Sequence, residues 1–197
     1  MKKFLVLLLI LLLAVSCAAP GASESPGKEA TPEEGVIVED EKGEESDSQL
    51  VIGNKVGNLA PDFELNTLEG DKVKLSDLRG KPVHMVFWSV DCVYCVKELP
   101  HVQEVYNENK DDYTVLAMNV TVQDGEDAAR KFIEDSGYDF PVVLIENTKE
   151  GLGALQDYQV RGIPLNVFLD SDGVVVYSVP GMMEEEQMTG VLKELMD

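Results

Sequence analysis

Residues 86–95 read VFWSVDCVYC and decide how the rest of the chain is interpreted. An apolar run typical of a buried strand ends at Trp88, and Cys92 and Cys95 follow with two residues between them. A helix-like pattern begins directly behind the two cysteines. Thiols at this spacing can close a disulfide within one helical turn, and the amide dipoles at a helix N-terminus favour a thiolate on the first sulfur. The stretch therefore indicates dithiol–disulfide exchange.

The segments around this stretch alternate between strand and helix patterns. Residues 83–88 are apolar nearly throughout, as expected for a strand that is covered on both faces. Residues 62–65 and 72–75 alternate polar and apolar side chains on either side of a turn at Gly70, which predicts a hairpin. Further strands are predicted at 114–120, 142–145, 166–169 and 174–179, and helices at 93–109, 124–136, 150–158 and 184–196. This order predicts an α/β domain with a mixed sheet.

The composition limits what the chain can bind. It has 197 residues, with 37 Asp and Glu against 16 Lys and Arg and a formal net charge of -21. Nucleic acid is therefore not expected as a partner, because there is no cationic surplus to neutralise phosphates. Direct adsorption to anionic lipid is disfavoured for the same reason. Only three cysteines are present, too few for a disulfide-held scaffold, so the core must be hydrophobic.

The N-terminus has the features of an export signal. A pair of lysines precedes an unbroken apolar run at 4–13, which is short against the ~20 residues that a spanning helix needs. Residues 13–17 (LAVSC) resemble a bacterial lipobox, whose cysteine becomes the first mature residue and carries the lipids. Ala14 departs from the usual leucine at that place. We expect a lipoprotein signal peptide at 1–16 and lipidation of Cys17; the alternatives are ordinary signal cleavage and an uncleaved anchor.

Residues 17–49 have the composition of a disordered segment. They are rich in Ala, Gly, Ser, Pro and Glu and almost lack large apolar or aromatic side chains, and their acids greatly outnumber Lys28 and Lys42. Such a segment cannot bury enough surface to offset its ordering entropy. We therefore expect an extended acidic tether that holds a folded domain, residues 50–197, off the membrane.

A Cys-x-x-Cys pair also occurs in proteins that carry out no redox exchange. Zinc usually takes four ligands, but the chain has no second cysteine pair, and neither His84 nor His101 has zinc-ligand spacing. A purely structural disulfide is another option, but this bridge would close a tiny loop and constrain the unfolded chain little. We therefore expect redox exchange at Cys92 and Cys95, with no metal and no cofactor. For both histidines we expect ordinary packing or solvation.

Several separated motifs resemble one protein superfamily. Residues 88–95 (WSVDCVYC) look like the active-site segment of the thioredoxin superfamily. Residues 57–63 (GNLAPDF) and 75–81 (LSDLRGK) resemble the entry and pre-strand motifs of its extracytoplasmic TlpA/ResA-type branch, which is a redoxin branch related to the AhpC/TSA family. Residues 158–170 (YQVRGIPLNVFLD) resemble the segment that bears a cis-proline. The resemblance runs from about 56 to 195 and implies a thioredoxin-like fold, a central mixed β-sheet flanked by helices with an N-terminal β-hairpin extension.

The resemblance also implies roles for individual residues. Cys92 would be the exposed nucleophile that attacks a substrate disulfide as its thiolate, and Cys95 the buried thiol that resolves the mixed disulfide. Pro164 would be cis and would place the backbone of Ile163 opposite the sulfurs, where an extended substrate segment can pair with it. A cis X-Pro bond is uncommon, about 5–6% of such bonds in folded proteins, and usually marks a functional constraint. We expect Trp88 and Ile163 to bind the substrate.

Glu98 fits the Cys-x-x-Cys-x-x-Glu pattern of the ResA-like members. It lies one helical turn beyond Cys95, so its carboxyl could exchange a proton with that thiol; the alternative is an ordinary solvated helix glutamate. Val86 stands where cytoplasmic thioredoxins carry a buried aspartate, which leaves Glu98 as the candidate proton shuttle. Asp91 stands where an aromatic residue is common, and a carboxylate beside the nucleophile disfavours its thiolate.

We therefore expect a thiol-disulfide oxidoreductase that is lipid-anchored to the cell membrane on its extracytoplasmic face. The resembling branch reduces apocytochrome c or other exported thiol proteins and draws electrons from a membrane dithiol carrier, which implies the same partners here. The alternative is a peroxide-reducing redoxin, since the entry motif is shared with the AhpC/TSA family. Peroxiredoxins carry a Pro-x-x-x-Thr-x-x-Cys loop, and residues 87–91 before Cys92 contain neither that proline nor that threonine. A metal chaperone is a third option, disfavoured by the missing ligands.

Overall fold

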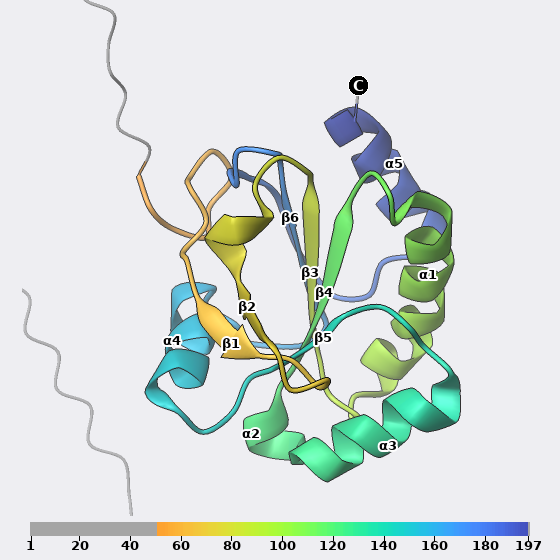
Figure 1. The fold of residues 1–197 in the computed structure, drawn as a ribbon. Coiled ribbons are helices and arrows are strands. Elements are labelled where there is room, and N and C mark those ends of the chain that lie inside the picture. The colour runs from red at the N-terminus through yellow and green to blue at the C-terminus, as the bar shows by residue number, and fades with distance from the viewer. Residues whose placement is uncertain (1–50, 197) are drawn as a thin grey trace, which may run out of the picture. The chain divides into compact units, whose positions relative to one another are not determined.

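The computed structural model describes residues 51–196, which form a five-stranded sheet with helices on both faces (Figure 1). The strand order across the sheet is β5-β4-β3-β6-β7. These strands are β3 (Val83–Trp88), β4 (Thr114–Asn119), β5 (Val142–Leu144), β6 (Leu165–Leu169) and β7 (Val175–Pro180). The helices are α1 (Val93–Asn109), α2 (Thr121–Asp124), α3 (Glu126–Ser136), α4 (Lys149–Asp157) and α5 (Glu185–Met196). The prediction of a mixed α/β sheet is confirmed.

The strand β3 lies at the centre of the sheet. It pairs in parallel with β4 and antiparallel with β6, so that Val86 lies between Ala117 and Asn166. All its residues are buried, which explains why its sequence is apolar nearly throughout rather than alternating. The register brings the polar side chain of Asn166 next to the strand that leads into the cysteine pair.

Two hydrophobic clusters lie on the two faces of the sheet. One contains Val86 and Trp88 together with residues of α1, α3 and α5. The other contains Met85 and Phe87 together with residues of α4 and of the N-terminal hairpin. Figure 1 shows the same division, with α1 and α5 on one side of the sheet and α4 and the hairpin on the other. Since both clusters are built from residues of the segment 51–196 on the two faces of one sheet, we expect this segment to fold as a domain.

The N-terminal hairpin consists of β1 (Glu64–Asn66) and β2 (Lys72–Lys74). These strands form a separate two-stranded antiparallel sheet, so the hairpin is an extension outside the main sheet, as predicted. The turn between them requires Gly70, whose φ of 93° disfavours any residue with a side chain. One turn of 3-10 helix, Leu75–Leu78, follows the hairpin and leads towards β3.

The helix predicted at 124–136 is α3, which begins two residues later than predicted, and a short helix that was not predicted, α2, precedes it. The helix α2 ends at Asp124 and α3 begins at Glu126. Gly125 lies between them with a φ of 79°, which no right-handed helix contains. The break leaves Asp124 at a helix end, from which its carboxylate bonds the loop before α1.

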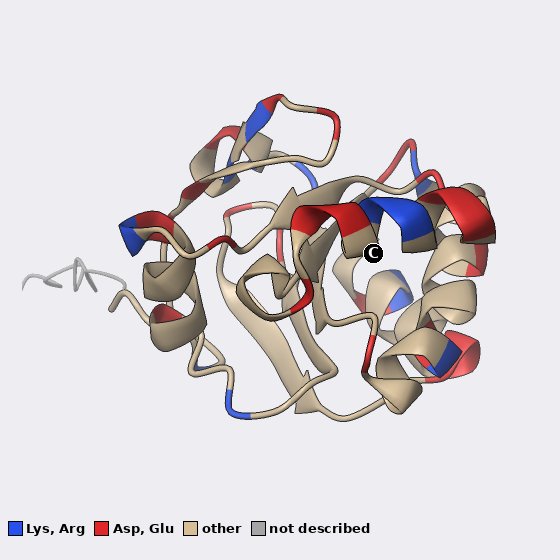
Figure 2. Cartoon of the chain, turned by 90° about the horizontal axis from the view of Figure 1, so that it is seen from below, with Lys and Arg blue, Asp and Glu red and all other residues tan. Residues whose placement is uncertain are grey.

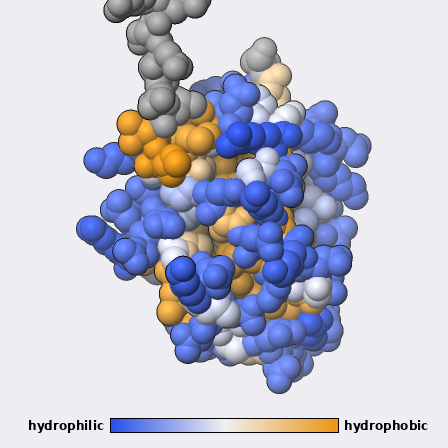
Figure 3. Space-filling model, turned by 60° about the vertical axis from the view of Figure 1, so that its left-hand side comes forward, coloured by the Kyte–Doolittle hydropathy of each residue, from blue (hydrophilic) through white to orange (hydrophobic). Residues whose placement is uncertain are grey.

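The predicted signal peptide at 1–16, the lipidation of Cys17 and the tether at 17–49 lie outside the described residues. Within 51–196, no helix is both long enough and apolar enough to cross a membrane. Figure 3 shows an apolar area beside the point where the described chain begins. The exposed apolar side chains of this first segment are Val51, Ile52 and Val56.

Candidate active site

Cys92 and Cys95 form a disulfide at the N-terminus of α1. Cys92 is the N-cap residue of this helix, and its Sγ accepts a hydrogen bond from the backbone N–H of Cys95 at 3.2 Å. Cys92 is partly exposed, whereas Cys95 is completely buried. After reduction, the backbone donor and the helix dipole would both stabilise negative charge on the first sulfur. The N-terminus of α1 therefore favours the thiolate of Cys92, the more accessible of the two cysteines.

The peptide bond between Ile163 and Pro164 is cis, as predicted, and lies next to the disulfide. The Sγ atom of Cys92 is 3.6 Å from the carbonyl oxygen of Ile163. A groove runs along this segment and is lined by residues that include Arg161, Ile163, Pro164, Pro180 and Gly181. An extended peptide that reaches Cys92 would therefore pass the backbone of Ile163.

Trp88 does not have the role expected from the sequence. Its side chain is completely buried and packs against Phe132, with ring centroids 5.3 Å apart. A buried indole cannot touch a docked substrate, so the prediction that Trp88 binds substrate is wrong. The residue instead fixes the end of β3 against α3, because a large buried aromatic contributes strongly to packing.

Glu98 is completely buried on α1, so it is not a solvated helix glutamate. Its Oε1 accepts hydrogen bonds from Asn166 Nδ2 and from the backbone N–H of Met183, each at 2.7 Å. Burial raises the pKa of Glu98 to about 7, because the charged form loses its hydration; the two hydrogen bonds act in the opposite direction, and the charge of Glu184 raises the pKa further. A carboxyl group with this pKa can both accept and donate a proton near neutral pH.

Two buried polar residues behind Glu98 were missed as site residues in the sequence. His84 Nε2 lies 2.7 Å from Asn166 Oδ1, and the imidazole stacks on Phe168 with ring centroids 4.1 Å apart. Burial lowers the pKa of His84 to about 4, against the effect of its bond to Asn166, so the ring is neutral at physiological pH. The only signal in the sequence was the presence of a histidine and an asparagine inside two otherwise apolar strands.

The loop between β3 and α1 is held by Asp124, which was also missed. Its carboxylate accepts hydrogen bonds from Ser89 Oγ at 2.6 Å, from the backbone N–H of Val90 at 2.9 Å and from Asn119 Nδ2 at 2.8 Å. The Ser89 hydroxyl in turn accepts a hydrogen bond from the backbone N–H of Asp91 at 3.2 Å. This carboxylate therefore fixes the residues that immediately precede Cys92, and no local sequence signal distinguished it from a helix-start aspartate.

Asp124→Ala should destabilise the domain by about 1–3 kcal/mol, because three donors around the loop lose their common acceptor. Insulin reduction should also slow several-fold, since the loop no longer holds Cys92 in one position. Urea unfolding and the insulin assay measure the two effects. Asp127→Ala removes an exposed carboxylate from the first turn of α3 and is the matched control. Equal stability of the two variants would show that Asp124 does not hold the loop.

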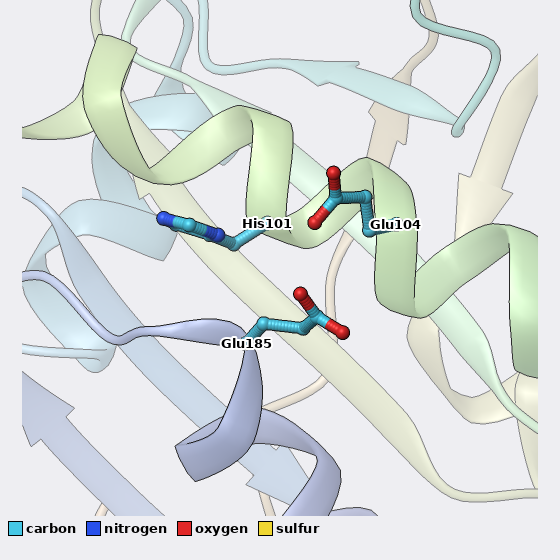
Figure 4. A group of neighbouring side chains, drawn as sticks. All are labelled: His101, Glu104 and Glu185. Carbon is cyan, nitrogen blue, oxygen red and sulfur yellow. The ribbon is translucent and has the colours of Figure 1, made fainter.

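A second group of titratable side chains lies on α1 and α5, about 13 Å along the helix from the cysteines. His101, Glu104 and Glu185 approach one another so that one ligand atom from each lies within 4.8 Å of the others (Figure 4). His101 Nε2 already forms an ion pair with Glu184 Oε2 at 3.0 Å. A hydrogen bond with the neighbouring carboxyl group of Glu104 raises the pKa of Glu185. These contacts explain why the three side chains lie close together without a bound ion. That the protein binds no metal stays a prediction.

Charged residues do not form a basic patch near the site. Figure 2 views the fold from the end where α2 and α3 lie, and its blue segments are short and separated by red ones. In this view basic residues do not gather along one face, as a phosphate backbone would require. The expectation that nucleic acid is not a partner stays a prediction.

Comparisons with known proteins agree with the geometry. The sequence model of the AhpC/TSA family matches residues 56–178. The chain is 30% identical over 196 residues to the thiol-disulfide oxidoreductase ResA of Bacillus cereus strain ZK / E33L, a match that covers 99% of each chain. Its fold is similar to the thioredoxin domain of a thiol-disulfide oxidoreductase from Bacteroides vulgatus, with a TM-score of 0.63 and 26% identity over 73% of this chain and 99% of that one. It is also similar to the pneumococcal exposed lipoprotein thioredoxin of Streptococcus pneumoniae strain TIGR4, with a TM-score of 0.57 and 34% identity over 68% of this chain and all of that one (100%).

Proposed function

The chain belongs to the AhpC/TSA family and is a thioredoxin-like thiol-disulfide oxidoreductase, and from this premise we propose that it reduces disulfides of exported proteins while tethered to the membrane. The observation that carries the proposal is the position of Cys92. Its sulfur is partly exposed and lies 3.6 Å from the carbonyl oxygen of Ile163, beside the cis bond to Pro164. This arrangement offers a nucleophile and a backbone acceptor side by side to an extended disulfide-bearing segment.

The reaction is a two-step exchange between thiols and disulfides. The Cys92 thiolate attacks one sulfur of the substrate disulfide, forms a mixed disulfide and releases the other substrate sulfur as a thiolate. The Cys95 thiol then loses its proton and attacks Cys92 Sγ, which forms the disulfide seen in the structure and releases the second substrate thiolate. Two electrons have then passed to the substrate, and a membrane dithiol carrier must return two electrons to the domain.

The surface around Cys92 suits partly unfolded protein substrates, such as apocytochrome c. Val93 and Tyr94 directly follow the nucleophile and are 65% and 64% exposed. Exposed apolar side chains at a site favour contact with segments that are not yet buried in a folded core. This feature supports substrates that are reduced before or during their own folding.

Membrane tethering is supported by the sequence at the N-terminus. The apolar run at 4–13 and the lipobox-like residues 13–17 favour a lipid on Cys17, and the acidic segment 17–49 favours an extended tether. One of the similar structures is described as an exposed lipoprotein thioredoxin. We therefore place the domain on the extracytoplasmic face of the cell membrane, held by a lipid anchor.

A Cys95→Ser variant of the full chain should accumulate mixed disulfides with exported proteins, because no thiol remains to resolve them. The adducts are identified by mass spectrometry of the membrane fraction after thiols have been blocked. Adding Cys17→Ser should move the adducts out of the membrane fraction without changing their identity. Finding no adducts, or adducts with cytoplasmic proteins only, would overturn the proposed substrate class.

A peroxidase function is the second candidate, because the entry motif at 57–63 resembles that of the AhpC/TSA family, whose model matches this chain. The polar group beside Cys92 Sγ is the backbone carbonyl of Ile163. Ser89 occupies the position three residues before Cys92, where peroxiredoxins carry a threonine, and its hydroxyl donates a hydrogen bond to Asp124. The Ser89 hydroxyl is thus already engaged in holding the loop. This geometry favours a protein disulfide over a peroxide as substrate.

A further inference from the structure

A line of buried polar side chains connects β3, β6 and α1. His84, Asn166 and Glu98 are all completely buried. His84 Nε2 and Asn166 Oδ1 are 2.7 Å apart, and Asn166 Nδ2 is 2.7 Å from Glu98 Oε1. Three polar residues linked in the core are costly unless their hydrogen bonds are satisfied, so their orientation is tightly determined.

The orientation of the Asn166 amide follows from its neighbours. Asn166 Nδ2 also donates to the carbonyl oxygen of Gly181 at 3.2 Å, and a carbonyl oxygen can only accept. The amide nitrogen must therefore face Gly181 and Glu98, which leaves Oδ1 against His84. Because Oδ1 is an acceptor, His84 must carry its proton on Nε2. His84 and the Gly181 carbonyl thus together hold the amide in the orientation that presents a donor to Glu98.

The same contacts determine where Glu98 carries a proton. Its Oε1 accepts from both Asn166 Nδ2 and the backbone N–H of Met183, so a proton on this oxygen would meet two donors. The other oxygen, Oε2, is buried and has no hydrogen-bond partner among the described residues. A neutral Glu98 therefore carries its proton on Oε2. Cys95 precedes Glu98 by three residues and lies on the same face of α1.

We propose that Asn166, held by His84, is a positioning residue that reserves Oε2 of Glu98 for proton exchange with the thiol of Cys95. The inference rests on the proposed function, in which Cys95 resolves a mixed disulfide. In that step the Cys95 proton passes to Oε2 of the Glu98 carboxylate, and the Cys95 sulfur bonds to Cys92 Sγ. The bond between Cys92 and the substrate sulfur breaks, and the substrate leaves as a thiolate with the electron pair.

The position of Asn166 in the sheet supports this role. Its register partner in β3 is Val86, where the resemblance to thioredoxins places a buried aspartate. In this chain the polar side chain beside that position is Asn166 of the neighbouring strand β6, which lies two residues after the cis-proline Pro164. One residue thereby connects the substrate-facing segment to the carboxyl group behind Cys95.

Other titratable groups near Glu98 come from three elements. Glu184, in the segment before α5, raises the pKa of Glu98 through its charge, and it forms an ion pair with His101 of α1. His84 of β3 stays neutral, since burial lowers its pKa to about 4. In the oxidised protein Cys95 does not titrate. The titration of Glu98 can therefore be observed in the disulfide form without interference from the thiols.

The test follows the Glu98 carboxyl by ¹³C NMR in the oxidised domain, residues 51–197, with Glu98→Gln to assign the signal. The wild-type midpoint is expected at about 7. Asn166→Leu removes a donor to the carboxylate and should raise the midpoint by about 1–2 pH units. His84→Phe keeps a ring that can stack on Phe168 but removes the hydrogen bond to Asn166 Oδ1, so that only Gly181 still orients the amide, and should shift the midpoint in the same direction by a smaller amount.

The control is Val167→Ala, which removes buried atoms from the same strand on the other face of the sheet. It should lower stability but leave the Glu98 midpoint unchanged. An Asn166→Leu midpoint unchanged from wild type would overturn the proposal. If Asn166→Leu does not fold, the Glu98 midpoint is measured in His84→Phe. An unchanged midpoint in that variant would also overturn the proposal.

Activity assays distinguish this inference from the proposed function. The pH profile of insulin reduction should move upward in Asn166→Leu together with the Glu98 midpoint, while Val167→Ala should keep the wild-type profile. A wild-type domain that shows the Glu98 shifts but reduces no protein disulfide would refute the proposed function alone. A domain that reduces insulin normally while Asn166→Leu leaves both the midpoint and the profile unchanged would refute the positioning role alone.

Discussion

Cys92→Ser should lower the reduction of insulin by residues 51–197 to the rate given by dithiothreitol alone. The variant lacks the only partly exposed sulfur of the pair, and the remaining Cys95 is completely buried, so no thiolate can reach a substrate disulfide. A serine hydroxyl does not replace it, because disulfide exchange requires a thiolate nucleophile. The measurement is the turbidity of precipitating insulin chains, with circular dichroism to show that the variant is folded.

The same preparation separates the two candidate functions. The wild-type domain should turn over insulin disulfides readily and hydrogen peroxide poorly, because the loop before Cys92 lacks the peroxide-orienting threonine. A folded Cys92→Ser variant with wild-type insulin activity would refute the assignment of the nucleophile. Faster turnover of peroxide than of insulin would instead favour the peroxidase.

Glu98→Gln should slow the resolution of the mixed disulfide by about 100-fold at neutral pH, because positioned proton transfer typically contributes at least this factor. Glutamine can still accept the hydrogen bonds of Asn166 and Met183 through its carbonyl oxygen, so the core should remain intact. Stopped-flow decay of a preformed mixed disulfide measures the step. An unchanged rate and an unchanged pH profile would remove Glu98 from the mechanism.

The same substitution should change how stability depends on pH. The pKa of Glu98 is raised from 4.5 in the unfolded chain to about 7 in the folded protein, so the folded state binds the extra proton between these values. Its stabilising contribution is fully present below about pH 4.5 and is lost as the pH rises through about 7, which amounts to about 3 kcal/mol. Urea unfolding of the oxidised domain should show this loss in wild type and not in Glu98→Gln. The exposed control, Glu134→Gln, should keep the wild-type dependence.

Local sequence patterns predicted the elements of the fold because those elements depend on local properties. The apolar run at 83–88 and the helix pattern at 93–109 each identified an element with the bounds that the structure shows. The helix predicted at 124–136 begins at Glu126 because the positive φ of Gly125, which the sequence does not reveal, separates it from the short helix α2 that was not predicted. Trp88 was misassigned because the sequence does not show that its side chain is buried against Phe132.

The sequence by itself determined the redox pair, its place between a strand and a helix, and the mixed α/β sheet that surrounds it. Only the tertiary structure decided what lies around the pair, because those contacts join residues far apart in the chain. Asn166 reaches Glu98 across 68 positions, His84 reaches Asn166 across 82, and Asp124 reaches Ser89 across 35. Burial then raises the pKa of Glu98 to about 7, since loss of hydration acts only after the elements have packed.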